Sequence, residues 1–190
     1  MPHSFRAFFF AIAALFFSIC APSAFAAGYD KLQEPYPGLM AEAEEMATLD
    51  AIMPVRIFNL ASRFAEAPDP ELTAKLVDKE LTRSTDKRGF VRRVGYTALR
   101  FMKRKDFKGT NVSQVIMRGL DDPVEWVRYD AVWAGEAVGL DTPAFRKKLA
   151  EMAKGLDPSE YESIPASDAK KQRQRRAGRL LKKLETGKKK

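Results

Sequence analysis

The chain has 190 residues, of which 45% are hydrophobic and 31% charged, with 33 Lys and Arg against 25 Asp and Glu. This apolar fraction excludes disorder along the whole length, and the length predicts one modest domain. The only Cys (Cys20) and the only His (His3) lie within the first 26 residues. We expect those residues to be removed, so the mature chain is predicted to have no disulfide, no thiol or imidazole catalyst and no Cys/His metal site.

Residues 1–26 have the pattern of a secretory signal peptide. Arg6 precedes an uncharged, Phe-rich run over residues 7–21, and Ala24-Phe25-Ala26 has the small-x-small form of a cleavage site. The run is shorter than the roughly 20 residues that span a bilayer, although an uncleaved anchor is the alternative. The sequence therefore predicts cleavage after Ala26 and a periplasmic or secreted protein.

A period of 36 residues organises the rest of the chain. The pattern Asp-x4-Val-Arg occurs three times at this spacing, as Asp50, Val55 and Arg56, as Asp86, Val91 and Arg92, and as Asp122, Val127 and Arg128. Within each period, apolar residues recur at helical spacing and Pro or Gly separates two helices. No stretch alternates in the way a strand does, so we predict no sheet. The expected fold is all-α, a short right-handed α-solenoid of about three helical hairpins.

The predicted solenoid covers residues 37–156. Its first part, residues 37–48, reads as a lone helix that covers the N-terminal end of the stack. Equivalent residues of a repeat should occupy equivalent positions in the fold. We therefore expect Val55, Val91 and Val127 to line one continuous core.

The repeat also resembles a known family. Asp-x4-Val-Arg followed by small residues, as at Ala131 and Ala134, is similar to HEAT-like helical repeats of the armadillo type, including those of phycobilisome-lyase-type domains. The resemblance covers about residues 49–156 and implies stacked helix pairs that serve as adaptors or scaffolds, or in a few members as lyases. The first unit departs from the pattern, because Asn59 and Ser62 stand where small apolar residues are expected. No tetrapyrrole ligand or acid–base residue of the lyases can be mapped onto the chain.

The recurring Asp and Arg residues have two interpretations. An Arg column can bind anions, or each Arg can pair with an Asp and tie neighbouring units together. We favour the ladder, because every Arg comes with its own Asp at a fixed spacing. Its predicted members are Asp50, Arg56, Asp86, Arg92, Asp122 and Arg128.

Asp130 is unusual, because Phe58 and Val94 fill the equivalent position of the other units. A buried carboxylate without a partner is costly. We therefore expect a pair with an Arg of the adjacent unit, such as Arg93. The alternative is a general acid or base with a raised pKa, but no second catalytic group lies at a suggestive spacing.

Trp126 and Trp133 are seven residues apart on one predicted helix. We expect them to be core residues rather than a recognition patch, because the aligned positions are mostly apolar. Tyr129, at the rim of the same stripe, is the better candidate for contact with a partner.

Residues 168–190 carry eleven basic and two acidic residues, a net charge of +9, whereas residues 27–167 carry −2. This segment also has an apolar stripe at helical spacing, formed by Ala177, Leu180, Leu181 and Leu184. Three interpretations stay open: the helix caps the last repeat, lies on an anionic membrane surface, or binds an acidic protein or, less favoured, nucleic acid. The candidate partner contacts here are Arg173, Arg175, Arg176, Arg179, Lys182 and Lys183.

The function predicted from the sequence is that of an exported, non-catalytic adaptor or scaffold that binds a protein partner, with a basic tail for an acidic partner or anionic surface. The alternatives are a lyase-like enzyme or maturation factor on a HEAT-like scaffold, and a membrane-surface tether. The sequence contains no Gly-rich phosphate loop and no calcium loop, so no cofactor or metal is expected.

Overall fold

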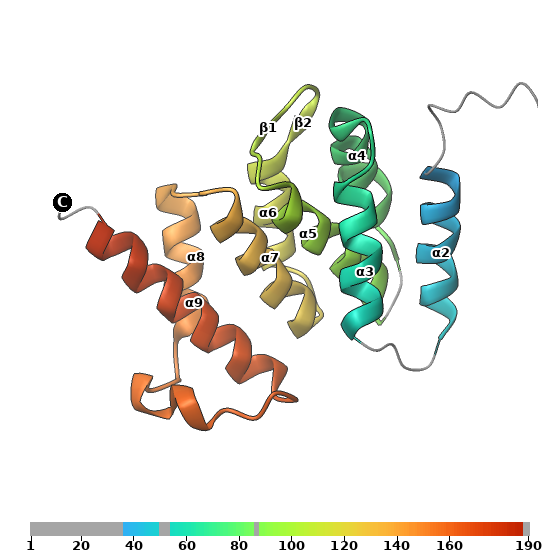
Figure 1. Ribbon diagram of the computed structural model, residues 1–190. Helices are drawn as coiled ribbons and strands as arrows, with labels where there is room; N and C mark the ends of the chain where they lie inside the picture. The colour runs from blue at the N-terminus through green and yellow to red at the C-terminus, as the bar shows by residue number, and fades with distance from the viewer. Residues whose placement is uncertain (1–35, 50–53, 86–87, 188–190) are drawn as a thin grey trace, which may run out of the picture. The chain divides into compact units, whose positions relative to one another are not determined.

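The computed structural model describes residues 36–49, 54–85 and 88–187. These residues are mostly helical, which confirms the predicted all-α class (Figure 1). They belong to a single unit, Pro35–Lys190. The predicted signal peptide at residues 1–26 lies outside the described residues, as do Asp50 and Asp86 of the predicted ladder.

Eight α-helices follow one another through the described residues, with a π-helical turn η2 (Val77–Leu81) and a 3-10 turn η3 (Pro158–Ser163) between them. The helices are α2 (Tyr36–Thr48), α3 (Pro54–Ala65), α4 (Pro70–Leu76), α5 (Phe90–Met102), α6 (Val112–Leu120), α7 (Glu125–Ala137), α8 (Pro143–Ala153) and α9 (Ala169–Thr186).

Four of these helices, α3, α5, α7 and α9, pack side by side in chain order (Figure 1). Helix α5 lies between α3 and α7, and α7 lies between α5 and α9. Helices α6 and α8 pack against α7 and α9, respectively, and α2 packs against both α3 and α5. Each helix of the series thus buries its apolar stripe against its neighbours.

Several helices are preceded by a polar residue whose side chain accepts a hydrogen bond from a backbone N–H of the first turn. Asp69 Oδ1 accepts from the Leu72 N–H at 2.9 Å, and Thr142 Oγ1 accepts from the Phe145 N–H at 3.1 Å. In both cases a proline is the first helical residue, where its missing N–H costs nothing. Asp122 does not cap α7 directly. It instead accepts from the Val124 N–H at 2.8 Å in the turn before the helix, which begins at Glu125.

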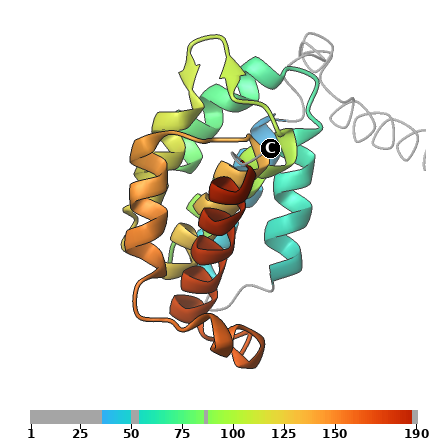
Figure 2. The ribbon, with the colours of Figure 1, turned by 90° about the vertical axis from the view of Figure 1, so that its left-hand side faces the viewer.

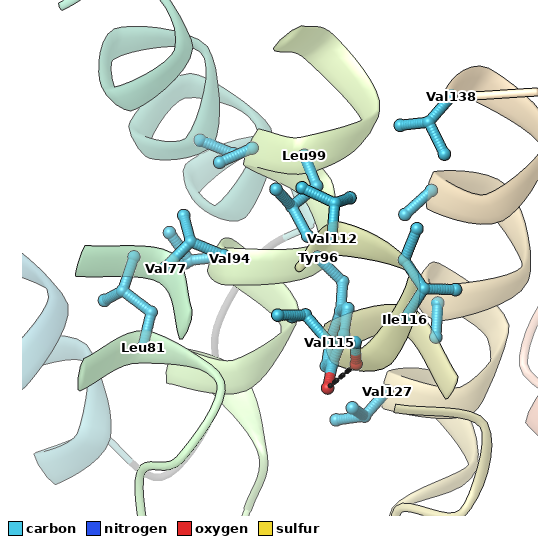
Figure 3. Packing of buried hydrophobic residues seen from close by; sticks show 14 of the residues in the cluster. Val77, Leu81, Val94, Tyr96, Leu99, Val112, Val115, Ile116, Val127 and Val138 are labelled. Carbon is cyan, nitrogen blue, oxygen red and sulfur yellow. Dashed lines mark hydrogen bonds between the residues drawn. The ribbon is translucent and has the colours of Figure 1, made fainter. Parts of the chain in front are cut away.

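The core joins α5 to α6 and α7 (Figure 3). Tyr96 is the largest fully buried side chain, and its hydroxyl donates to the Val115 carbonyl at 3.2 Å. Burial raises the pKa of Tyr96 to about 12. Gly119 on α6 lies against the Tyr96 ring, and an added Cβ would meet a ring atom at 2.4 Å. A residue without a side chain is therefore needed where these two helices meet.

The first unit does not follow the repeat at its first helix. Val91 and Val127 are buried, but Val55 is 50% exposed, so the expectation that all three line the core is wrong for Val55. The buried face of α3 is formed by Ile57, Leu60, Ala61 and Phe64. Val55 lies two residues before Ile57, which places it about 200° around the helix and on the outer side. Phe58 is 37% exposed as well, although Val94 at the equivalent position of the next unit is fully buried.

The prediction that the chain contains no sheet is wrong at one short hairpin. Strand β1 (Asp106–Phe107) pairs antiparallel with β2 (Thr110–Asn111), with Phe107 opposite Thr110. Gly109 adopts φ +77°, which suits a tight turn between the strands. Two residues per strand are too few to show alternation in the sequence, so periodicity could not reveal them.

The basic C-terminal segment forms α9, which lies alongside α8 and also packs against α7 (Figure 2). Ala177 and Leu180 are buried, and Leu181 and Leu184 pack against the core. The predicted apolar stripe is therefore in contact with the rest of the unit. None of the helices in the described ranges is long and apolar enough to cross a bilayer.

Candidate binding surface

Aromatic and arginine side chains form a continuous series across α3, α5, α7 and α9, the four helices that pack in chain order (Figure 1). Every member contacts at least one other member through a ring pair or a guanidinium placed over a ring, and these contacts connect the whole set. We call this surface the aromatic–arginine face. Its residues are Phe58, Arg93, Arg100, Phe101, Trp126, Tyr129, Trp133 and Arg176.

Trp133 is the centre of this face. The Arg100 guanidinium carbon lies 3.8 Å from the ring centroid, and that of Arg176 lies 3.2 Å away. Trp133 therefore connects α5 to α9 through two cation–π contacts, each of the kind that stabilises by roughly 0.5–2 kcal/mol.

A pocket of about 410 Å³ opens beside Trp133. The cationic groups Arg100, Lys103 and Arg176 line it, together with one carboxylate, Glu136. Phe101, Ala137 and Trp133 supply its apolar wall. The pocket is therefore amphipathic, with more positive than negative charge.

The single carboxylate of the pocket already has cationic partners. Glu136 pairs with Arg176 through Oε2 and with Lys183 through Oε1, the latter at 3.1 Å. Within the described part of the chain, Arg100 and Lys103 form no ion pair. Burial lowers the pKa of Arg176, and the charges of Arg100 and Arg179 lower it further. The attraction of Glu136 acts in the opposite direction without offsetting these effects. The positive charge of this site is thus only partly compensated.

Two residues that line the pocket each have an unpaired hydrogen-bond donor. Trp133 Nε1 and Arg176 Nε are buried and have no acceptor among the described residues, although buried N–H groups nearly always have one. Both atoms are closed off from solvent, so a ligand in the pocket would meet the charged groups and not these donors.

Lys103, on the rim of the pocket, has a strained backbone. Its φ is +55°, and it is the one non-glycine residue with positive φ in the ranges that the structure describes. It stands just after α5, where glycine is the usual residue, and its N–H donates to the Leu99 carbonyl at 3.2 Å. A lysine in this conformation costs about 1 kcal/mol, and it keeps an ammonium group beside the pocket.

Apolar side chains continue the face beyond the pocket. The rings of Phe58 and Phe101 are 6.2 Å apart, and the Arg100 guanidinium lies 5.8 Å from the Phe58 ring. Phe58 and Val55 are the large hydrophobic side chains that stay exposed in the described residues. An exposed apolar group beside uncompensated cations is typical of an interaction surface.

Asp130 lies beneath the face and is buried. Arg93 Nε donates to Asp130 Oδ2 at 2.7 Å, which is the pair expected from the sequence. Desolvation raises the pKa of Asp130 to about 6, although Arg93 and Arg100 favour its ionised form. Arg93 also lies over the Trp126 ring at 5.2 Å. The carboxylate thus orients an arginine of the face and does not line the pocket.

The recurring Asp and Arg residues have three different surroundings. Arg92 binds both carboxylate oxygens of Asp122, at 2.6 and 3.1 Å, and both side chains are buried. Arg128 pairs with Glu125 and donates to the Asp122 carbonyl. Arg56 reaches Glu45 only at 3.9 Å in an exposed position. Asp50 and Asp86 are outside the described residues.

The predicted partner contacts on the basic segment differ in accessibility. Arg173 is buried, with Nε 2.7 Å from Glu125 Oε2 and Nη1 2.8 Å from the Met152 carbonyl, so it is not exposed to a partner. Arg175 donates to the Tyr161 carbonyl at 2.9 Å, and Arg179 pairs with Glu162. Lys182 and Lys183 are exposed.

The aromatic triad of α7 is neither core nor fully exposed. Trp126, Tyr129 and Trp133 are all half-buried, with Tyr129 making edge contacts to both tryptophans at 5.4 and 6.3 Å. Tyr129 is therefore accessible in part, as expected, but the two tryptophans share its position instead of lying in the core.

No group of three or more His, Cys, Asp and Glu side chains that could hold a metal ion occurs among the described residues. Comparison with protein-family models, with curated proteins and with solved structures gave no match.

Arg93, Arg100, Phe58 and Phe101 were not identified as site residues from the sequence. A signal was nevertheless present, because Arg93 and Arg100 have the same seven-residue spacing on α5 as Trp126 and Trp133 have on α7. Two adjacent helices with matched spacing place each Arg over a Trp.

Proposed function

We propose that the protein is an exported, non-catalytic adaptor or scaffold that binds a protein partner through the aromatic–arginine face. The observation that carries this proposal is the continuity of that face over four helices, from Phe58 on α3 to Arg176 on α9. Trp, Tyr, Phe and Arg are the residue types that contribute most to protein–protein binding.

The proposal includes the architecture. We infer a short right-handed α-solenoid of HEAT-like type, in which α3, α5 and α7 begin successive units and α9 closes the series. Two buried ion pairs support this inference. Arg92 and Arg93 on α5 pair with Asp122, just before α7, and with Asp130 on α7, so both pairs join one unit to the next. Stacked units of this kind present an extended surface, which suits an adaptor.

The two alternatives have weaker support. A membrane tether needs an exposed apolar stripe on the basic helix, but Ala177 and Leu180 are buried. A lyase-like enzyme needs an acid–base group at a pocket, but Asp130 is paired with Arg93 below the surface, and Glu136 is shared by two cations. Export itself is inferred from residues 1–26 alone.

The proposal is tested by photo-cross-linking in the cells that produce the protein. A benzophenone side chain is placed at Phe58 or Tyr129 on the face, or at Lys147, which is exposed on α8 outside the face. We expect both face positions to capture the same protein, Lys147 not to capture it, and Trp133→Ala to reduce the yield. Equal capture from Lys147, or none from the face, would contradict the proposal.

A further inference from the structure

We infer that the pocket beside Trp133 and the apolar shelf of α3 together bind an acidic segment of a partner protein, one that presents carboxylate and apolar side chains close together. This inference rests on the proposed function and names the chemistry of the partner. The two halves of the surface are adjacent, because Arg100 contacts both the Trp133 ring and the Phe58 ring.

The cationic half selects negative charge. Arg100, Lys103 and Arg176 line the pocket, and its one carboxylate, Glu136, is bound to Arg176 and Lys183. A guanidinium whose hydrogen bonds are not used by a protein carboxylate is the preferred binding group for an incoming one. A basic or neutral segment would leave these cations uncompensated.

The apolar half selects the residues that flank the carboxylates. Val55 and Phe58 are exposed on one side of α3, and Phe58 packs against the half-buried ring of Phe101. A phosphate group alone would use the cations and leave this shelf bare. A protein segment can supply both kinds of side chain within a few residues, so we assign the site to such a segment.

The backbone conformation of Lys103 favours a role of this residue in binding over a role in folding. Its positive φ would favour glycine, as at Gly89, Gly109, Gly139 and Gly155, which all have positive φ. A lysine at this position therefore stabilises the fold less than glycine would. Lys103 lines the pocket, and its charge gives the strained position a use in binding an anion.

The experiment measures binding of a fluorescein-labelled peptide of alternating Glu and Phe by fluorescence anisotropy. Analogues with Gln or Lys in place of Glu serve as charge controls. The wild-type chain is expected to bind the Glu peptide at least about tenfold more tightly than the Gln analogue, the difference that charge-assisted hydrogen bonds produce. Affinity should fall as salt is raised.

Three variants locate the binding site. Arg100→Gln and Lys103→Gly are each expected to weaken the Glu peptide about fivefold or more, since each removes one charged contact, and Lys103→Gly should not lower the Tm. Phe58→Ser should weaken the Glu and Gln peptides equally. Lys147→Gln, which removes an equal charge from α8, should change nothing.

Equal binding of the Glu and Gln peptides would overturn the inference, as would unchanged binding by Arg100→Gln and Lys103→Gly. No binding of the Glu peptide, including the case where the chain binds vesicles of anionic phospholipid instead, would overturn it too. The proposed function is judged separately: cross-linking from the face that is insensitive to Arg100→Gln would leave the adaptor role standing and remove the acidic partner.

Discussion

Arg92 on α5 binds both oxygens of the Asp122 carboxylate, although thirty residues separate them in the chain. The pair is closed off from solvent, with side-chain exposures of 7% and 8%. Asp122 also accepts from the Val124 N–H, and Arg92 donates to the Ser84 carbonyl at 3.1 Å. A buried pair with these additional hydrogen bonds fixes the entry of α7 relative to α5.

Removing one partner of this pair should destabilise the protein strongly. We expect Arg92→Met or Asp122→Asn to lower the free energy of unfolding by about 3–5 kcal/mol, because each leaves the other group buried and uncompensated. Urea denaturation followed by circular dichroism measures the change. Arg56→Met is the matched control at the first repeat position; its exposed 3.9 Å contact with Glu45 predicts a loss of about 0.5 kcal/mol or less. Similar losses in all three variants would argue against a stabilising role that is specific to the buried Arg92–Asp122 pair.

The contact between Gly119 and Tyr96 should not tolerate a methyl group. An alanine at residue 119 would place its Cβ 2.4 Å from the Tyr96 ring, so Gly119→Ala is expected to cost about 1–3 kcal/mol through overpacking. Gly38→Ala on α2 is the control, because nothing lies within 4 Å of its added Cβ. That change should be neutral or stabilise by up to about 1 kcal/mol. Thermal melts of both variants test the pair, and equal shifts would refute the close approach.

Leu180 should be important for stability although it lies in the basic segment. Its side chain is 3% exposed, so Leu180→Ala is expected to cost about 2–5 kcal/mol. Lys182→Ala, two residues away and exposed, should stay within about 0.5 kcal/mol of wild type. Chemical denaturation distinguishes these results; two small losses would show that the helix is not packed.

Asp130 should make stability fall as pH rises. Its pKa is raised from 3.8 to about 6 in the folded protein, so between these values the unfolded chain releases a proton that the folded chain retains. The Asp130 contribution is therefore complete below about pH 4 and is lost as pH approaches 6. The stability of wild type minus that of Asp130→Asn should decrease across this window by on the order of 2 kcal/mol.

Asp157 provides a control of opposite sign. Hydrogen bonds from Ser159 hold the pKa of Asp157 below its usual value, so its contribution is present above the unfolded pKa and is lost as pH falls. The difference between wild type and Asp157→Asn should therefore shrink toward acid pH. If the Asp130→Asn difference also shrank toward acid pH, the assignment for Asp130 would be contradicted.

The sequence predicted the elements that depend on local periodicity and capping. The N-terminal helix, expected at residues 37–48, appears as Tyr36–Thr48. The Arg93–Asp130 pair could also be predicted, because an apolar repeat position had received a carboxylate. Both predictions need only the helical period and the cost of burying a charge.

Other features depend on packing between helices and could not be read from one period. Val55 matches Val91 and Val127 in letter, but a shift of the buried face of α3 turns it to the outside. The aromatic–arginine face requires side chains from four helices, and which of them meet is set by how the helices are rotated. The matched spacing of Arg93 and Arg100 with Trp126 and Trp133 was visible, but only the helix packing gives it meaning.

Helix α9 must be a packed part of the unit for the proposed function, since it supplies Arg176 to Trp133 and to the lining of the pocket. Amide hydrogen exchange of the full chain, resolved by residue, tests this directly. We predict that amides of α9 between Gln172 and Leu181 are protected to a degree comparable with those of α7. Exchange of these amides at the rate of an unstructured peptide, while α7 stays protected, would contradict the account.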